Sequence, residues 1–187
     1  MGYIAQKHGD LVAMVAGDDG STTYLPLKGS NQHLETLLQH IEKKATLQAA
    51  DSNLVRQFDY IARSIRRRMM IVVVSDDMEL NDDHKRLLRR LGAQHELMWI
   101  TIGDSDVLQQ QSTGADAYDV SDTVTVPAFL LKDKQVAAEF AKTSAERNQV
   151  MQQQLDRLRI SNHRVIGEAD AVTGLFKLLE KQRYARR

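Results

Sequence analysis

The sequence predicts an α/β fold built on a mostly parallel sheet, and two apolar stretches carry that prediction. Residues 70–74 (MIVVV) are five apolar residues in a row, mostly β-branched and without period-2 alternation, which is typical of a strand buried on both faces of a parallel sheet. A second apolar strand is predicted over Glu96–Ile102, after a predicted helix over Asp82–Leu91. Strand, helix and strand in this order form a βαβ unit, so we expect parallel strands with a right-handed connection.

The composition limits the class of protein. The 187 residues suffice for one α/β domain with a core, and we expect a single domain over residues 1–187. The 25 basic and 25 acidic side chains cancel, so no net field favours nucleic acid or an anionic membrane. The absence of cysteine excludes disulfides, thiolate metal sites and a cysteine nucleophile, and it suits a cytoplasmic location. No apolar run approaches the roughly 20 residues of a membrane helix.

A helix end and a hairpin are predicted for the first thirty residues. Tyr3–His8 resembles the end of a helix that the following glycine stops. Leu11–Ala16 is a predicted buried strand, and Thr22–Leu27 is its predicted antiparallel partner. The Gly-Asp-Asp-Gly sequence at 17–20 favours a tight turn between them. Pro26 lacks an amide hydrogen, which places the second strand at a sheet edge.

Two amphipathic helices are predicted next, before the central strand at 69–75. The first covers Asn31–Lys44 with Asn31 as its cap. The second covers Asn53–Arg67, capped by Asp51 or Ser52.

The remaining elements follow the βαβ unit, whose helix we expect to end at Gly92. A short strand is predicted at Ala117–Val120, and a long helix rich in glutamine and charge is predicted at Lys134–Arg159. A last short strand at His163–Ile166 and a helix at Val172–Arg183 complete the chain.

Acidic residues follow both strands of the βαβ unit. Ser75, Asp76 and Asp77 come directly after the central strand, while Asp104 and Asp106 end the next one. Ligands of open α/β sheets gather outside the carboxyl ends of the strands. Carboxylates suit Mg²⁺ or Ca²⁺, although aspartates at these places also start turns and cap helices.

The order of these motifs resembles a bacterial family called domain of unknown function 58, a branch of the von Willebrand factor A-like fold. Gly9, Asp10, Val12, Leu25 and Pro26 match its Gly-Asp-x-Val pattern, hairpin and Leu-Pro pair. IVVVSD at 71–76 resembles its apolar strand ending in Ser-Asp. QHELMWITIGD at 94–104 resembles its Arg-His-x-Val strand, with Gln94 replacing the usual arginine. The resemblance extends through the long helix, short strand and closing helix.

The resemblance implies a Rossmann-type, mostly parallel sheet with helices on both faces and an antiparallel edge hairpin, truncated at its N-terminus. It also implies a metal-ion-dependent adhesion site, in which Asp76 matches the aspartate of the third loop and Ser52 replaces the usual threonine. The Asp-x-Ser-x-Ser motif of the first loop is absent from the sequence. We therefore expect Mg²⁺ or another divalent cation to bind weakly or not at all.

The function predicted from this resemblance is a non-enzymatic interaction module of the von Willebrand A type. Its interaction rim would comprise Ser75, Asp77 and Asp104, and the resemblance implies a MoxR-type AAA+ ATPase as partner. One alternative is a metal-dependent hydrolase that uses Asp76, Asp77 and Asp104. The sequence has no G-x-S-x-G elbow, no H-E-x-x-H and only six scattered histidines, which disfavours catalysis. Another alternative is a structural subunit with a vestigial acidic rim.

The strand order implied by the resemblance also predicts that copies of this chain associate, unless two of its own strands pair. In von Willebrand A-type sheets the strand order resembles 3-2-1-4-5-6, and under this resemblance we expect the chain to begin after the first, central strand. Leu11–Ala16 would be strand two and Met70–Ser75 strand four. An open gap would leave unpaired amides and carbonyls at both edges. We expect these two strands to pair directly, or another copy of the chain to fill the gap in a homo-oligomer.

Overall fold

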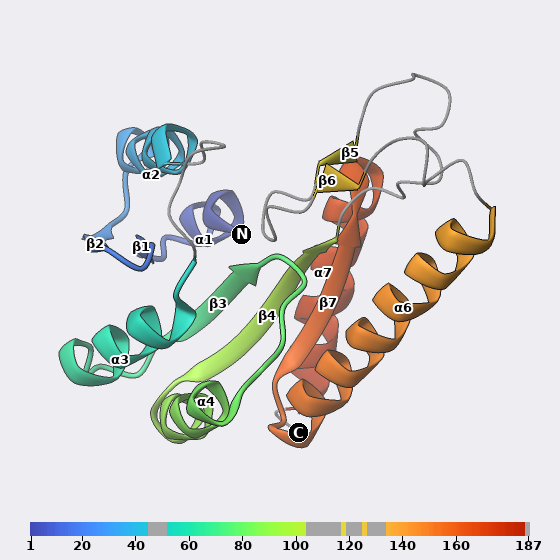
Figure 1. Cartoon of the computed structure of the whole chain (residues 1–187). Helices are drawn as coiled ribbons and strands as arrows, with labels where there is room; N and C mark the ends of the chain where they lie inside the picture. Colours follow the sequence, from blue (N-terminus) through green and yellow to red (C-terminus); the bar gives the residue numbers. More distant parts are fainter. Residues whose placement is uncertain (45–51, 104–116, 119–124, 127–133, 186–187) are drawn as a thin grey trace. The chain divides into compact units, whose positions relative to one another are not determined.

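The computed structural model describes residues 1–44, 52–103, 117–118, 125–126 and 134–185 (Figure 1). It divides into two compact units, Met1–Arg67 and Arg68–Arg187, which are described separately below. The α/β class is confirmed, since an antiparallel hairpin and a parallel three-stranded sheet are both flanked by helices. Whether the units form a single domain stays a prediction.

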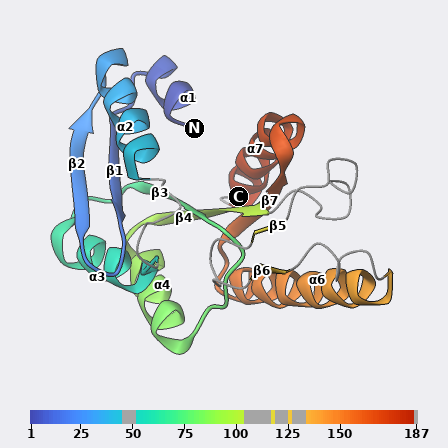
Figure 2. The ribbon, with the colours of Figure 1, turned by 45° about the horizontal axis from the view of Figure 1, so that its top comes forward.

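The first unit is built on the predicted hairpin. β1 (Val12–Gly17) pairs antiparallel with β2 (Thr22–Lys28) as a two-stranded sheet (Figure 2). Asp18 holds the turn, because its Oδ1 accepts hydrogen bonds from the amides of Gly20 (2.9 Å) and Ser21 (2.7 Å). These bonds, with that from the Ser21 amide as the largest cause, lower the pKa of Asp18.

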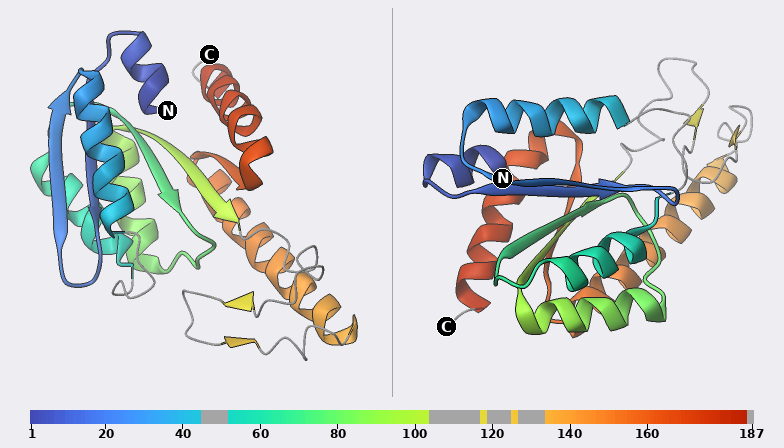
Figure 3. Two further views of the ribbon diagram at one scale, coloured as in Figure 1. Left: turned by 90° about the horizontal axis from the view of Figure 1, so that it is seen from above. Right: turned by 90° about the vertical axis from the view of Figure 1, so that its left-hand side faces the viewer.

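Three helices accompany the hairpin. α1 (Gly2–Lys7) ends before Gly9, whose φ of 77° is a left-handed conformation that glycine adopts without strain. α2 (Asn31–Lys44) and α3 (Leu54–Ser64) lie on opposite sides of the two strands (Figure 3, right). His33 on α2 lies with its Nε2 3.0 Å from the carbonyl oxygen of Val12 on β1, which joins the helix to the hairpin.

Both predicted caps in this unit are wrong by one or two residues. The amide of His33 donates to the Ser30 hydroxyl (3.1 Å), so Ser30 caps α2 in place of Asn31. Asn53 caps α3 in place of Asp51 or Ser52, because its side chain accepts from the Arg56 amide at 3.0 Å. The Asn53 amide group also donates to Asp19 in the hairpin turn (2.5 Å), a tertiary contact that selects this residue as the cap.

The second unit contains the parallel sheet in the order β3-β4-β7. β3 (Met70–Ser75) pairs with β4 (Glu96–Gly103), and β4 pairs with β7 (Ser161–Ile166). The helix between the first two strands is α4 (Asp82–Gln94), so the predicted βαβ unit is confirmed. A short antiparallel pair, β5 (Ala117–Tyr118) and β6 (Thr125–Val126), also belongs to this unit. Residues 119–120 of the predicted strand at Ala117–Val120 lie outside the described residues.

Helices cover both faces of this sheet, as the fold class requires. α4 packs on the face that carries Leu97, and residues of α6 (Lys134–Arg157) line a pocket with Thr101 and Arg164 on that same face. α7 (Gly167–Ala185) packs on the other face, where its Gly174 lies against His163. Trp99, on the face with Leu97, is fully buried, and it marks the centre of the core.

Several predicted boundaries differ from the structure. α4 continues through Gly92 to Gln94, because Gly92 does not adopt the positive φ with which a glycine ends a helix. β7 starts at Ser161, before the predicted His163, and α7 starts at Gly167, before the predicted Val172. Gly167 has a φ of 73°, which allows the chain to turn from strand directly into helix.

Within the first unit β1 pairs with β2, and within the second unit β3 pairs with β4. Direct pairing of β1 with β3, one alternative for the sheet, would join the two units and stays a prediction. The other alternative, a second copy of the chain at the open edge, stays a prediction. No helix within the described ranges is long and apolar enough to cross a membrane.

Candidate functional site at the carboxyl edge of the sheet

Ser75 and Asp77, two of the residues predicted as a rim, lie where the parallel strands end. Ser75, the last residue of β3, is in register with Thr101 of β4, which in turn is in register with Arg164 of β7. Asp76 and Asp77 follow in the loop toward α4, and both are exposed. Asp104 and Asp106 lie outside the described residues, so the carboxyl edge is described through Ser75, Asp76 and Asp77.

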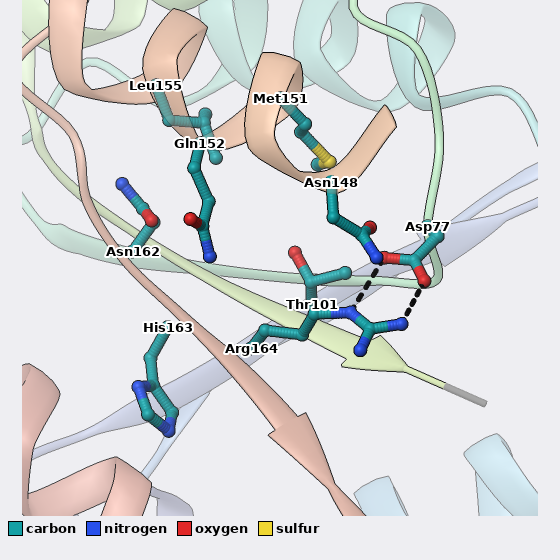
Figure 4. Close-up of a pocket in the computed structure, with 9 residues that line it drawn as sticks. All are labelled: Asp77, Thr101, Asn148, Met151, Gln152, Leu155, Asn162, His163 and Arg164. Carbon is teal, nitrogen blue, oxygen red and sulfur yellow. Dashed lines mark hydrogen bonds and ion pairs between the residues drawn. The ribbon is translucent and has the colours of Figure 1, made fainter. Parts of the chain in front are cut away.

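An ion pair across the sheet is the main polar feature of this edge. The guanidinium of Arg164 donates from Nε to Asp77 Oδ1 (3.2 Å) and from Nη2 to Asp77 Oδ2 (2.5 Å), as Figure 4 shows. The side chains keep 22% and 31% of their exposure, so water screens this pair only in part. Because Arg164 lies on β7 and Asp77 follows β3, we call this two-bond pair the cross-sheet clamp.

Gly103 on β4 makes room for the cross-sheet clamp. A Cβ at this position would lie 2.4 Å from Cζ of Arg164 and 2.6 Å from its Nη2, closer than real atoms approach. The guanidinium therefore passes over the backbone of the middle strand at Gly103 on its way to Asp77. Any larger residue there would have to displace the arginine.

A second polar contact fixes the end of β3. Trp99 on β4 is fully buried, and its indole N–H donates to the Ser75 hydroxyl at 3.0 Å. The Ser75 hydroxyl donates in turn to the carbonyl oxygen of Asp76 at 2.9 Å. A buried indole N–H requires such an acceptor, so the serine serves the core as well as the rim.

The space beneath the cross-sheet clamp is small. Side chains of α6, including Asn148, Met151 and Gln152, close it from one side (Figure 4). Its empty volume is about 240 Å³ even when space open to solvent is included. The described residues at this edge therefore leave a shallow space that is partly open to solvent.

His163 lies on the opposite face of the sheet from Arg164, although the two are adjacent in sequence. Its Nε2 is 3.4 Å from Asp170 Oδ2 on α7, and it packs against Gly174. It therefore takes part in the packing of α7 on the sheet.

The described residues do not form a complete shell for a divalent cation. They contain no group of three or more histidine, cysteine, aspartate or glutamate side chains that could hold a metal ion. Both carboxylate oxygens of Asp77 already accept hydrogen bonds from Arg164. Ser52 belongs to the first unit and Asp76 to the second, so their joint role as ligands stays a prediction. One carboxylate and one hydroxyl leave most of the near-octahedral shell of Mg²⁺ to water.

Arg164 is the site residue that the sequence analysis did not identify. The sequence did contain a signal, because a charged residue within a short strand next to the core requires a partner of opposite charge. The partner itself was not predictable, since Asp77 lies 87 residues away in the sequence.

Comparison with known proteins gives one result. A family model described as "Protein of unknown function DUF58" matches residues 1–150. Searches of curated proteins and of solved structures found no match to the chain.

Proposed function

The chain belongs to the family described as protein of unknown function DUF58, and on that premise we propose that it is a non-enzymatic protein-interaction module. The partner would bind at the carboxyl edge of the β3-β4-β7 sheet, against the rim that Ser75 and Asp77 begin. We place this activity in the cytoplasm, where a chain without cysteine suits the reducing conditions.

The cross-sheet clamp is the observation that carries this proposal. It joins the loop after β3 to β7 across the middle strand, so the ends of all three strands are held together. A preorganised polar rim loses little conformational freedom when a protein surface docks on it. The space beneath the rim is shallow and partly open to solvent among the described residues, which also supports docking of a protein surface.

The partner class comes from the resemblance noted in the sequence. We propose a MoxR-type AAA+ ATPase, with a divalent cation contributing weakly through Asp76 and Ser52 if at all. The adhesion-site chemistry of von Willebrand A-type domains would need more oxygen ligands than these two side chains provide.

The hydrolase alternative has less support. It needs Asp77 as a metal ligand, whereas Arg164 occupies both of its carboxylate oxygens. It also needs a general base near the rim, and His163 lies on the other face of the sheet. The third alternative, a purely structural subunit, predicts no specific partner at this edge.

Binding of a purified MoxR-type ATPase to the immobilised chain tests the proposal. We expect Asp77→Asn to weaken binding at least fivefold, because it removes a rim charge and loosens the cross-sheet clamp. The matched control is Glu180→Gln, which removes one exposed negative charge about 20 Å along α7 from the carboxyl edge. Equal affinities for both variants, or no binding of the ATPase by the parent chain, would contradict the proposal.

Turnover assays complete this test. We expect no Mg²⁺- or Mn²⁺-dependent hydrolysis of phosphate and ester substrates. Hydrolysis that disappears in Asp76→Ala would favour the hydrolase alternative.

A further inference from the structure

Two amide side chains of α6 line the space beneath the cross-sheet clamp. Asn148 and Gln152 lie one helical turn apart, the first half-buried and the second exposed (Figure 4). The same face of α6 carries Met151 and Leu155, which are buried and attach the helix to the sheet. In the part of the chain that the structure describes, neither amide group takes part in a hydrogen bond. Both amides therefore keep their donors and acceptors available for a ligand.

The cross-sheet clamp also keeps hydrogen-bonding groups in reserve. Nε and Nη2 of Arg164 donate to Asp77, while Nη1 makes no hydrogen bond within the described ranges. Each carboxylate oxygen of Asp77 accepts one of these bonds and has a second lone pair. Thr101, in register with Arg164, adds a hydroxyl group to the lining. We call the space lined by Asn148, Gln152, Thr101 and the two clamp residues the amide slot.

The five side chains of the amide slot carry no net charge. Arg164 and Asp77 neutralise one another, and the other three side chains are neutral. A carboxylate or an ammonium group in the slot would lose part of its hydration without meeting an unpaired opposite charge. A neutral polar group loses less on leaving water and requires only matching hydrogen bonds. The slot therefore favours a neutral polar ligand over an acidic or a basic one.

Among neutral side chains, the amide of glutamine or asparagine matches the slot best. It has a carbonyl oxygen that accepts hydrogen bonds and an NH2 group that donates two. Nη1 of Arg164 can donate to that oxygen, while Asp77 and the two amide groups of α6 can accept from the NH2 group. A hydroxyl group offers a single donor and an apolar side chain offers none, so either would leave more groups of the slot unpaired.

We propose that the amide slot binds the side chain of a glutamine or asparagine in the partner segment that docks on the rim. This inference rests on the proposed function, because the docking protein supplies the segment. The slot shares Asp77 with the rim, so a segment that lies on the rim can place one side chain in the slot. The rim then provides the docking surface, and the slot selects a neutral amide at one position of the partner.

Blocked tripeptides test the slot on the chain alone. The probes are acetyl-Gly-Gln-Gly-amide and the two peptides in which glutamate or lysine replaces the glutamine. Their binding would be measured by NMR, from shift changes of the side-chain NH2 resonances of Asn148 and Gln152. We expect the glutamine peptide to bind at least about fivefold more tightly than either charged peptide. Equal affinities for the three peptides, a preference for a charged one, or no binding of the glutamine peptide at about 20 mM would overturn the proposal.

Matched variants of α6 locate this binding. Asn148→Leu and Gln152→Met nearly preserve the size of each side chain but remove its hydrogen-bonding groups. We expect each to weaken binding of the glutamine peptide about fivefold, the effect of one ordinary hydrogen bond, as measured from the remaining amide. The control is Gln153→Met, because Gln153 is exposed and does not line the slot, and it should leave the affinity unchanged. Equal affinities for Gln152→Met and Gln153→Met would overturn the proposal.

Binding of the purified MoxR-type ATPase separates this inference from the proposed function. We expect Gln152→Met to weaken ATPase binding about threefold or more, and Gln153→Met to leave it unchanged. ATPase binding that Asp77→Asn weakens and Gln152→Met does not would overturn the slot but leave the proposed function intact. Selective binding of the glutamine peptide by a chain that does not bind the ATPase would support the slot and overturn the proposed partner.

Discussion

The cross-sheet clamp between Arg164 and Asp77 allows a quantitative prediction of stability. Hydrogen bonds between charged groups contribute about 1.5–3 kcal/mol when buried, whereas exposed ion pairs contribute about 0.2–1 kcal/mol. The two side chains are 22% and 31% exposed, so the pair lies between these limits. We therefore expect a coupling free energy of about 1–2 kcal/mol between the two residues.

A double-mutant cycle measures this coupling. Arg164→Met and Asp77→Asn would be studied singly and together by urea unfolding at one fixed protein concentration. Trp99 is the single tryptophan of the chain and is fully buried, so its fluorescence reports the unfolding of the second unit. We expect each single variant to lower the free energy of unfolding by about 1–2 kcal/mol, and the coupling to decrease in 1 M salt. Strictly additive single effects, with coupling below about 0.3 kcal/mol, would refute the reasoning.

Three further predictions concern the same unit. Gly103→Ala should destabilise the parent chain by about 1–2 kcal/mol, because the guanidinium of Arg164 must move. The same substitution should be neutral or stabilising in the Arg164→Met background. Equal losses of stability in both backgrounds would contradict this prediction. Burial lowers the pKa of His84 below 6.5, against an opposing effect of Asp83. The neutral imidazole of His84 therefore stabilises the fold fully above pH 6.5. This stabilisation is lost as the pH falls through the pKa of His84 in the folded chain. The urea concentration at the midpoint of unfolding, measured between pH 5 and 8, should fall less steeply with decreasing pH in His84→Gln than in the parent chain. Identical profiles for the two chains would exclude a contribution of His84 to the pH dependence of stability. Calorimetry should detect no Mg²⁺ binding tighter than about 1 mM, and micromolar binding would contradict the incomplete ligand shell.

Much of the fold was predictable because its main elements depend on local patterns. β3 and β4 are apolar runs around a helix with a clear cap, so the βαβ unit followed from the sequence. The hairpin followed from two apolar stretches and a Gly-Asp-Asp-Gly turn. These signals act over a few residues, and the tertiary contacts of the structure leave the predicted elements unchanged.

The errors arise where tertiary contacts choose between similar residues. Asp51, Ser52 and Asn53 can all cap a helix, and the contact of Asn53 with Asp19 decides among them. β7 starts two residues before the predicted His163, at the polar residues Ser161 and Asn162. Ser161 is nevertheless buried in the structure, in register with Met98 of β4.

The candidate site was predictable only in part for the same reason. Its location followed from the rule that ligands gather at the carboxyl edge of parallel strands, and it led to Ser75, Asp76 and Asp77. The role of Asp77 did not follow, since it depends on Arg164 from a distant strand and on the space that Gly103 provides. A sequence pattern identifies which charges are near an edge, but not which of them neutralise one another.

Hydrogen exchange of the chain with and without a purified MoxR-type ATPase tests the central proposal most directly. The chain would be kept at one concentration in both samples, so that any self-association is the same. We expect the ATPase to slow exchange in peptides that cover residues 75–80 and 100–103, at the carboxyl edge of the sheet. Protection confined to residues 1–67, or no protection in the presence of saturating ATPase, would contradict the account.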